Sequence, residues 1–228
     1  MLVPISPRLL ACAEFVKNGA RVADIGCDHG YLSIYLLTNG IAQGAIAADI
    51  NAGPLDSARR NAQKYGVADK MCFCLSNGVA NVPRDFDTLV CAGMGGITMI
   101  SILEAAPWLK NGQYRLILQC QSKTPALRQY LFENGWQIVR ERILRDGRFL
   151  YTVMEVCWQA VSSPMTAGEF YFPQALFENP APVVEEYHRQ VVKKLRIRVA
   201  GHGENADPQE KNALAYLESL TCLKEENP

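Results

Sequence analysis

The stretch that decides the fold runs from Arg21 to Leu32 and reads Arg-Val-Ala-Asp-Ile-Gly-Cys-Asp-His-Gly-Tyr-Leu. A short apolar strand passes directly into a turn that contains two glycines, and an apolar helix begins at Tyr31. In doubly wound α/β folds, a Gly-rich turn between the first strand and the first helix binds a nucleotide. The segment therefore predicts a parallel sheet with a nucleotide site at its carboxyl edge.

The turn departs from the dinucleotide pattern G-x-G-x-x-G, because Asp28 stands where a second glycine would admit a pyrophosphate. A carboxylate at this place repels a diphosphate but is compatible with a cationic sulfonium. The sequence thus favours S-adenosylmethionine over NAD as the cofactor, and it disfavours a dinucleotide-dependent oxidoreductase.

Short apolar runs alternate with amphipathic segments through the first half of the chain, which is typical of βα units. A helix is predicted from Ser6-Pro7 to about Val16, where the serine is the N-cap. Strands are predicted at Arg21–Ile25, Gly44–Ile50, Met71–Leu75, Thr88–Ala92 and Arg115–Gln119, and helices at Tyr31–Thr38, Gly53–Tyr65, Ile97–Ala106 and Ala126–Asn134. We therefore predict an α/β, Rossmann-like fold with a doubly wound sheet.

Two extended runs follow, Trp136–Leu144 and Phe149–Trp158, joined through Asp146-Gly147. An Asp-Gly pair between strand-like runs predicts a β-hairpin with a type I′ turn, whose two central residues both have positive φ. The parallel sheet is thus expected to end in an antiparallel hairpin.

The last part of the chain is predicted to be helical. Its first helix covers about Val183–Ala200, Gly201-His202-Gly203 ends it, and Asp207-Pro208 opens a second helix with an N-cap and a first-turn proline. We divide the chain into an α/β domain at 1–160 that holds the predicted nucleotide site, a connector at 161–182 and a C-terminal α-helical hairpin at 183–228.

Further polar and glycine residues follow the predicted strands at the same edge of the sheet. Asp49 ends the second strand 21 residues after Asp28, where an acidic side chain can accept both ribose hydroxyls. Asn77-Gly78 is placed to lie along the edge of the adenine ring. Gly93-Met94-Gly95 permits close approach of a base or of the methyl donor. Singly, each of these residues is equally well a turn or capping residue, but their order indicates a class I S-adenosylmethionine-dependent methyltransferase. The predicted cofactor-binding residues are Asp24, Gly26, Asp28, Gly30, Asp49, Asn77, Gly78, Gly93, Met94 and Gly95.

Several motifs together with the terminal helical pair resemble the bacterial TrmK-type tRNA (adenine-N1)-methyltransferases over essentially the whole chain. These motifs are Asp24–Leu32, Asn77-Gly78, Ala92–Gly96 and Leu116–Gln119. The resemblance implies methylation of N1 of adenosine 22 in the D-arm region of bacterial tRNA, with S-adenosyl-L-methionine as donor and S-adenosyl-L-homocysteine as product. The chain departs from the family's usual residues at Gly30, Ser33 and Cys120-Gln121.

Adenine N1 carries its own lone pair, so methyl transfer to it chiefly needs positioning. N1 lies on the Watson–Crick edge, and the target base must therefore be unpaired and turned out of its stack. Asp28 is predicted to stabilise the positive charge of the product or to accept the N6 proton, while His29 and Tyr31 orient the base. The alternative is that Asp28 only caps the helix that begins near Gly30.

Phosphate contacts dominate RNA affinity, so tRNA binding is expected from basic surface. One candidate cluster lies in the predicted hairpin and one in the first C-terminal helix, and either alone is equally well a solvated face. They comprise Arg140, Arg142, Arg145, Arg148, Lys193, Lys194, Arg196 and Arg198. Two other functions stay open, a methyltransferase of another RNA or of a small molecule, and a non-catalytic RNA-binding module.

The chain has 228 residues, of which 49% are hydrophobic and 20% charged, an ordinary globular composition that argues against disorder. The formal net charge of zero combines 16 basic and 13 acidic residues in 1–157, a net +3, with 7 and 10 in 158–228, a net −3. Neutrality therefore excludes only an indiscriminate polyanion binder.

The 8 cysteines form no C-x-x-C pair, so we predict reduced, mostly buried thiols and no metal site. No apolar run approaches the roughly 18 to 20 residues that span a bilayer, and the first residues lack the features of a signal peptide. We expect a cytoplasmic protein without membrane contact, and a monomer is favoured.

Overall fold

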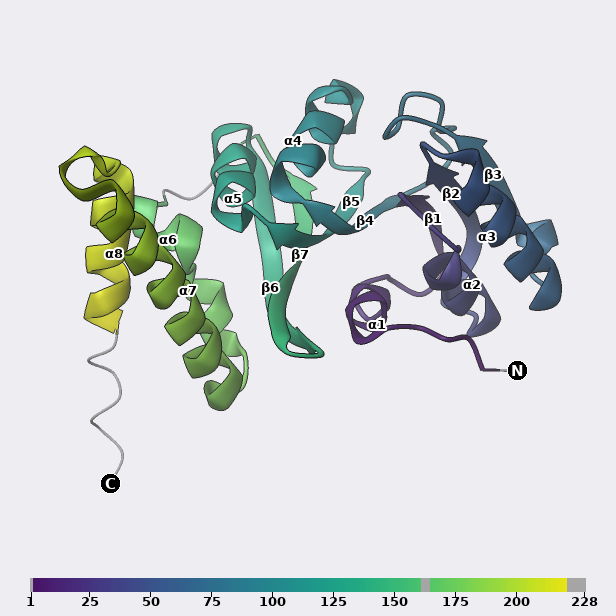
Figure 1. The fold of residues 1–228 in the computed structure, drawn as a ribbon. Coiled ribbons are helices and arrows are strands. Elements are labelled where there is room, and N and C mark those ends of the chain that lie inside the picture. Colours follow the sequence, from purple (N-terminus) through teal and green to yellow (C-terminus); the bar gives the residue numbers. More distant parts are fainter. Residues whose placement is uncertain (1, 161–164, 221–228) are drawn as a thin grey trace.

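The computed structural model describes residues 2–160 and 165–220, which form a sheet flanked by helices and a separate group of C-terminal helices (Figure 1). The sheet has seven strands in the order β3-β2-β1-β4-β5-β7-β6. The strands are β1 Ala20–Ile25, β2 Ala42–Asp49, β3 Met71–Leu75, β4 Thr88–Gly95, β5 Arg115–Ser122, β6 Trp136–Asp146 and β7 Phe149–Trp158. The first five are parallel, whereas β7 runs antiparallel to β5 and to β6. The predicted Rossmann-like fold with a terminal hairpin is therefore confirmed.

Helices cover both faces of the sheet, because successive residues of each strand point to opposite sides. Val22 packs in the core beneath α1, α2 and α3, while its neighbour Ala23 packs beneath α4 and α5. The helices are α1 Pro7–Ala13, α2 Tyr31–Thr38, α3 Ala52–Lys64, α4 Gly96–Glu104, α5 Thr124–Glu133, α6 Ala167–Tyr171, α7 Ala181–His202 and α8 Pro208–Ser219. Short 3₁₀ turns lie at η1 Ala68–Lys70, η2 Pro107–Leu109, η3 Gln174–Glu178 and η4 Gly203–Asn205.

The hairpin turn differs from the predicted type I′ turn. Asp146 pairs with Phe149, so the central residues are Gly147 and Arg148. Of these two, Gly147 alone has a positive φ, 57°. A glycine with positive φ at the first central position is the pattern of a type II′ turn, which fits the twist of the strands equally well. The Asp-Gly pair thus predicted the hairpin correctly but the turn type wrongly.

The glycine motif after the fourth predicted strand is also placed differently. We expected Gly93-Met94-Gly95 in the loop beyond Ala92, but β4 continues to Gly95. Met94 pairs with Cys120 and Gly95 with Ser122, with register shifts on either side. Because glycines have a low strand propensity, the sequence alone indicated a loop here.

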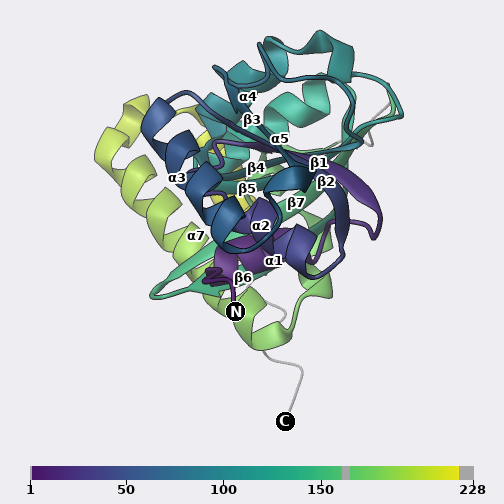
Figure 2. The same ribbon diagram turned by 90° about the vertical axis from the view of Figure 1, so that its right-hand side faces the viewer.

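The C-terminal helices pack against the hairpin and against each other (Figure 2). Their core contains Phe172, Leu195 and Leu217, together with Ile143 and Leu150 of the hairpin strands. The segment that we interpreted as a connector at 161–182 holds α6 and η3 and contributes Phe172 and Leu176 to this core. Residues 161–164 of that segment, and 221–228 with Cys222 at the end of the predicted helical hairpin, lie outside the described residues.

The end of α7 differs from the prediction. The first C-terminal helix runs to His202, and Gly203 with a φ of 54° caps it, so Gly201 does not end it as predicted.

Within the described part of the chain, no helix has the combination of length and apolar character needed to cross a membrane.

Candidate functional site

The loop between β1 and α2 takes the left-handed backbone conformation at Gly26, Asp28 and Gly30, with φ values of 71°, 51° and 72°. The amides of Gly26 and Cys27 both donate to the Ala48 carbonyl of β2, at 2.8 and 3.0 Å. Aspartate is one of the few residues with a side chain that adopt this conformation readily. The loop therefore turns tightly at the carboxyl edge of the sheet and leaves Asp28 at its tip.

Asp49, at the end of β2, is fixed by backbone amides on both of its carboxylate oxygens. Asp28 donates to Oδ2 at 3.3 Å and Asn51 donates to Oδ1 at 2.9 Å, and the residue is only 8% exposed. Each oxygen keeps a second lone pair for a ligand hydroxyl. The two acidic residues that the sequence placed 21 positions apart thus meet at one end of the sheet.

Asp24 lies beneath the loop and is fully enclosed. Burial raises the pKa of its carboxyl to about 6, although the Ser33 hydroxyl, which donates to Asp24 Oδ2 at 2.9 Å, opposes this shift. Ser33 was noted in the sequence only as a departure from the family pattern. The contact makes Asp24 a residue that supports the loop from below.

Met94 and Gly26 touch across the neighbouring strands. A Cβ at Gly26 would lie 2.3 Å from Met94 Cε, so the methionine side chain covers the glycine. The amide of Gly93 donates to Gln119 Oε1 at 3.0 Å, from a backbone with φ of 79°. Of the remaining predicted cofactor residues, Asn77 is exposed after β3 and Gly78 packs against Ile102.

Two side chains lie beside Gly93, of which sequence reasoning noted Gln121 only as a departure from the family pattern and did not find Arg8. A Cβ at Gly93 would lie 3.3 Å from Arg8 Nη1 and 3.5 Å from Gln121 Nε2. Arg8 comes from α1 and is held by an ion pair with Asp146 at 2.6 Å. A single arginine near the N-terminus carries no sequence signal for this position, which arises only because α1 packs beside β4 and β6.

Asp28, His29 and Tyr31 are brought together at the exposed side of the loop. The side chains of Asp28 and His29 are 73% and 52% exposed, and His29 Nε2 lies 3.6 Å from Asp28 Oδ1. The rings of His29 and Tyr31 are 6.0 Å apart. Gly30 is the N-cap of α2, which has no side-chain cap, so the alternative in which Asp28 only caps this helix is wrong.

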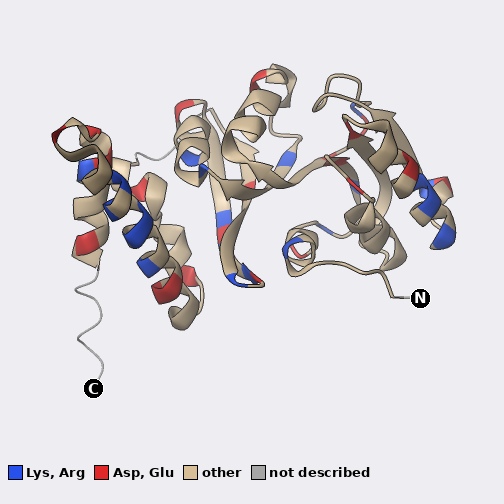
Figure 3. Ribbon diagram, viewed as in Figure 1, with Lys and Arg blue, Asp and Glu red and all other residues tan. Residues whose placement is uncertain are grey.

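Basic and acidic residues lie on the same elements in the hairpin and in α7 (Figure 3), and most of the predicted RNA-binding arginines form ion pairs within the chain. In the hairpin, Arg140 pairs with Glu155 at 2.5 Å, Arg142 with Glu14 and Arg145 with Glu186. In α7, Arg196 pairs with Glu218 and Arg198 with Glu210, at 2.6 and 2.8 Å. Among the described residues, Arg148, Lys193 and Lys194 have no ion pair, and Arg148 stacks on Phe149.

The next features are the groups that could bind a metal ion and the cysteine thiols. Within residues 2–160 and 165–220, no cluster of three His, Cys, Asp or Glu side chains could hold a metal ion. The seven described cysteines are free, and Cys72 is exposed where mostly buried thiols were expected. Burial raises the pKa of Cys12 to about 12, so that thiol stays protonated.

The parallel sheet, the glycine turn after β1 and the two acidic residues at the sheet edge define a methyltransferase domain. Residues 5–154 match the family described as Methyltransferase domain, and the chain belongs to that family. Solved structures allow a finer placement. The crystal structure of the Bacillus subtilis m1A22 tRNA methyltransferase TrmK has a TM-score of 0.77 and 30% identity, with 97% of both chains covered.

Streptococcus pneumoniae Sp1610, a candidate tRNA (m1A22) methyltransferase solved with S-adenosyl-L-methionine, has a TM-score of 0.82 and 30% identity over 95% of this chain and 99% of that one. In sequence, the tRNA (adenine(22)-N(1))-methyltransferase of Bacillus subtilis (strain 168) is 36% identical over 151 residues. This alignment covers 66% of the chain but only 63% of that protein's length. These similarities place the chain in the TrmK type.

Proposed function

We propose that this protein transfers a methyl group from S-adenosylmethionine to N1 of adenosine 22 in the D-arm region of bacterial tRNA. The observation that carries the proposal is the loop after β1, which presents the Asp28 carboxylate to solvent while its amide bonds Asp49. The activity named for the Bacillus subtilis relative supports the choice of acceptor. Because this is an enzyme of tRNA, the proposal includes a cytoplasmic location.

The residues at the loop fit S-adenosylmethionine. When bound, the cofactor supplies an electrophilic methyl group and leaves as S-adenosyl-L-homocysteine. Asp49 offers carboxylate lone pairs for the ribose hydroxyls, and Gly26 leaves room for the Met94 side chain to pack directly on the turn. Asp28, Asn77 and Gly93 stand exposed around the same edge. An anionic loop suits a sulfonium cation better than a diphosphate.

On the acceptor side, the chain has to hold the turned-out adenine with N1 toward the methyl group. N1 supplies the electron pair of the new bond, and the base becomes cationic. The Asp28 carboxylate stabilises this charge or accepts the N6 proton, and the His29 and Tyr31 rings orient the base. Nothing in this step calls for a Lewis acid, so we propose that the enzyme acts without a metal ion. We also propose that it acts as a monomer.

The first test incubates the protein with unmodified tRNA and S-adenosylmethionine and maps the product by primer extension. A methyl group on N1 blocks Watson–Crick pairing, so reverse transcription is expected to stop at adenosine 22. A tRNA with guanosine at this position serves as the negative control. The absence of a stop in the D-arm would remove the assignment to adenosine 22, and it would leave open a methyltransferase of another RNA or of a small molecule.

The second test is Asp28→Asn, because asparagine also tolerates the left-handed backbone and keeps the amide that bonds Asp49. We expect kcat for tRNA, measured at saturating cofactor, to fall by about 10² or more. Asp69→Asn is the matched control, since Asp69 is an exposed carboxylate in η1 at the opposite edge of the sheet. Full activity of Asp28→Asn would show that this carboxylate is not catalytic.

A further inference from the structure

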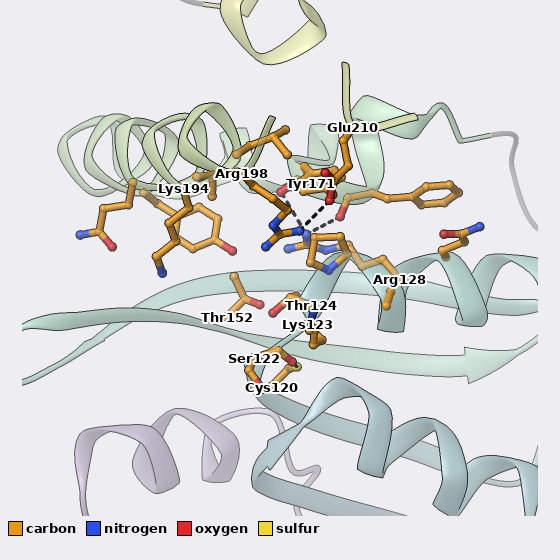
Figure 4. Close-up of a pocket in the computed structure, with 18 of the residues that line it drawn as sticks. Cys120, Ser122, Lys123, Thr124, Arg128, Thr152, Tyr171, Lys194, Arg198 and Glu210 are labelled. Atoms are coloured by element: carbon orange, nitrogen blue, oxygen red, sulfur yellow. Dashed lines mark hydrogen bonds and ion pairs between the residues drawn. The ribbon is translucent and has the colours of Figure 1, made fainter. Parts of the chain in front are cut away.

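A cavity of about 340 Å³ lies between the sheet and the C-terminal helices, apart from the loop after β1 (Figure 4). One wall is the end of β5 and the start of α5, the floor includes Thr152 of β7, and the other wall is α7 with the start of α8. Neither the cofactor loop nor the predicted catalytic residues line it. The proposed methylation therefore leaves this cavity without a role.

Thr152 has a buried hydroxyl without a partner. The residue is 0% exposed, it lines the cavity, and its Oγ1 has no hydrogen-bond partner among the described residues. A buried hydroxyl that makes no hydrogen bond destabilises the fold, and native proteins keep few of them. Thr152 is therefore a donor that a ligand in the cavity would satisfy.

The N-terminus of α5 opens on the same cavity. Lys123 is the N-cap, with a left-handed φ of 58°, and no side chain caps the helix. The first amides of a helix lack intrahelical acceptors and carry its positive dipole end. Pro125 has no amide hydrogen, so the donors of this first turn are the amides of Thr124 and Ala126, which together with the Thr152 hydroxyl form a set suited to an anion.

The charges around the cavity also favour an anion. The acidic residues on its walls are engaged, because Glu210 pairs with Arg198 at 2.8 Å and the Asp207 carboxylate accepts from the Gln209 amide at 2.9 Å. Lys123 and Lys194 line the cavity from opposite walls and take part in no ion pair within the described chain (Figure 4). The charge left for a ligand is positive.

The cavity adjoins the methylation site through the ends of β4 and β5. A Cβ at Gly95 would lie 3.0 Å from Ser122 Oγ, and one at Gly96 would lie 2.6 Å from the Lys123 carbonyl. The segment that lines the cavity therefore packs directly against the glycines that border the cofactor loop. In the sheet, β5 lies two strands from β1, which is about 10 Å, so the nucleotide next to a base held at Asp28 could reach Lys123 at the end of β5.

We propose that this cavity binds a backbone phosphodiester of the tRNA next to the methylated nucleotide. The proposal rests on the proposed function and adds a positioning contact to it. The Thr152 hydroxyl and the α5 amides donate to the phosphate oxygens, and Lys123 and Lys194 neutralise its charge. A volume near 340 Å³ is sufficient for one phosphate with its ribose.

The test compares tRNA affinity over a range of salt concentrations for Thr152→Val, Lys123→Gln and Lys194→Gln. Each lysine variant is expected to raise the Kd for tRNA about threefold to tenfold at low salt and to lower the salt slope by roughly 0.7 to 0.9. Thr152→Val should raise the Kd by about tenfold with an unchanged slope, because the hydroxyl is neutral. The Kd for S-adenosylmethionine should stay the same in all three.

Two variants serve as controls. Thr152→Ser keeps the hydroxyl and should keep wild-type tRNA affinity, which a merely structural role of Thr152 would not require. Lys70→Gln removes an equivalent charge at the exposed residue before β3, at the opposite edge of the sheet, and should change neither Kd nor slope.

The outcomes separate the two proposals. Wild-type Kd and salt slope in all three cavity variants, with methylation intact, would overturn the phosphate site and leave the methyltransferase standing. If inorganic phosphate raises the melting temperature of the wild type but not of Thr152→Val while tRNA affinity is unaffected, the cavity holds a free phosphate and not RNA. A wild-type protein that binds the cofactor but neither binds nor methylates tRNA would overturn both.

Discussion

Replacing Arg128 with methionine should cost the protein a large part of its stability. Arg128 is fully buried and makes a two-pronged ion pair with Glu141, with Nη2 at 2.6 Å and Nε at 3.2 Å from the two carboxylate oxygens. Its Nη1 also donates to the Phe170 and Tyr171 carbonyls, at 2.7 and 3.1 Å. One side chain thus joins α5, β6 and α6.

Removing one partner of a buried pair leaves the other charge uncompensated, which costs about 3–5 kcal/mol. Typical domains have total unfolding free energies of about 5–15 kcal/mol, so Arg128→Met should lower the melting temperature by roughly 6–20 °C. The measurement is urea unfolding, followed by circular dichroism, with the melting temperature from calorimetry.

The double variant Arg128→Met/Glu141→Gln removes the orphan charge and should regain roughly 2 kcal/mol of the loss. Arg196→Met is the matched control, since Arg196 is 62% exposed in its pair with Glu218 and should cost less than about 1 kcal/mol. Equal losses for Arg128→Met and Arg196→Met, or a double variant no more stable than the single one, would refute the reasoning.

Two further predictions concern the cofactor loop. The pKa of the Asp24 carboxyl is about 6 in the folded protein and about 3.9 in the unfolded chain. Between these two pH values the folded state holds a proton that the unfolded state has lost. The free energy of unfolding therefore falls as the pH rises from about 4 to about 6. Asparagine at position 24 does not titrate. The unfolding free energy of Asp24→Asn minus that of the wild type should therefore rise between pH 4 and pH 7.5, by at most about 3 kcal/mol. A difference that stays constant with pH would contradict this prediction. Gly26→Ala should cost about 1–2 kcal/mol for the positive φ and also weaken cofactor binding tenfold or more, because the new Cβ displaces Met94. Gly40→Ala has the same backbone conformation, with φ of 67° and open space around it, and should show the stability loss but normal cofactor affinity in calorimetry.

Local patterns in the sequence were sufficient for the fold and for the edge of the sheet at which the candidate cofactor residues lie. Alternating apolar runs and helical segments predicted the positions of the strands along the chain, since burial on both faces of a parallel sheet dictates that pattern. Asp28 and Asp49 could be paired from sequence because parallel strands end at one edge of the sheet. The Asp-Gly pair predicted a hairpin, although the type of its turn depended on the register of β6 and β7.

The tertiary structure decided everything that depends on partners distant in the chain. Arg142 meets Glu14 across 128 positions and Arg145 meets Glu186 across 41, so basic residues that look alike in the sequence differ in their freedom to bind RNA. The unpartnered hydroxyl of Thr152 and the cavity above it exist only because the C-terminal helices pack over β7. Hydrophobic periodicity and turn chemistry act over a few residues, whereas ion pairing, burial and cavities are set by which segments the whole fold brings into contact.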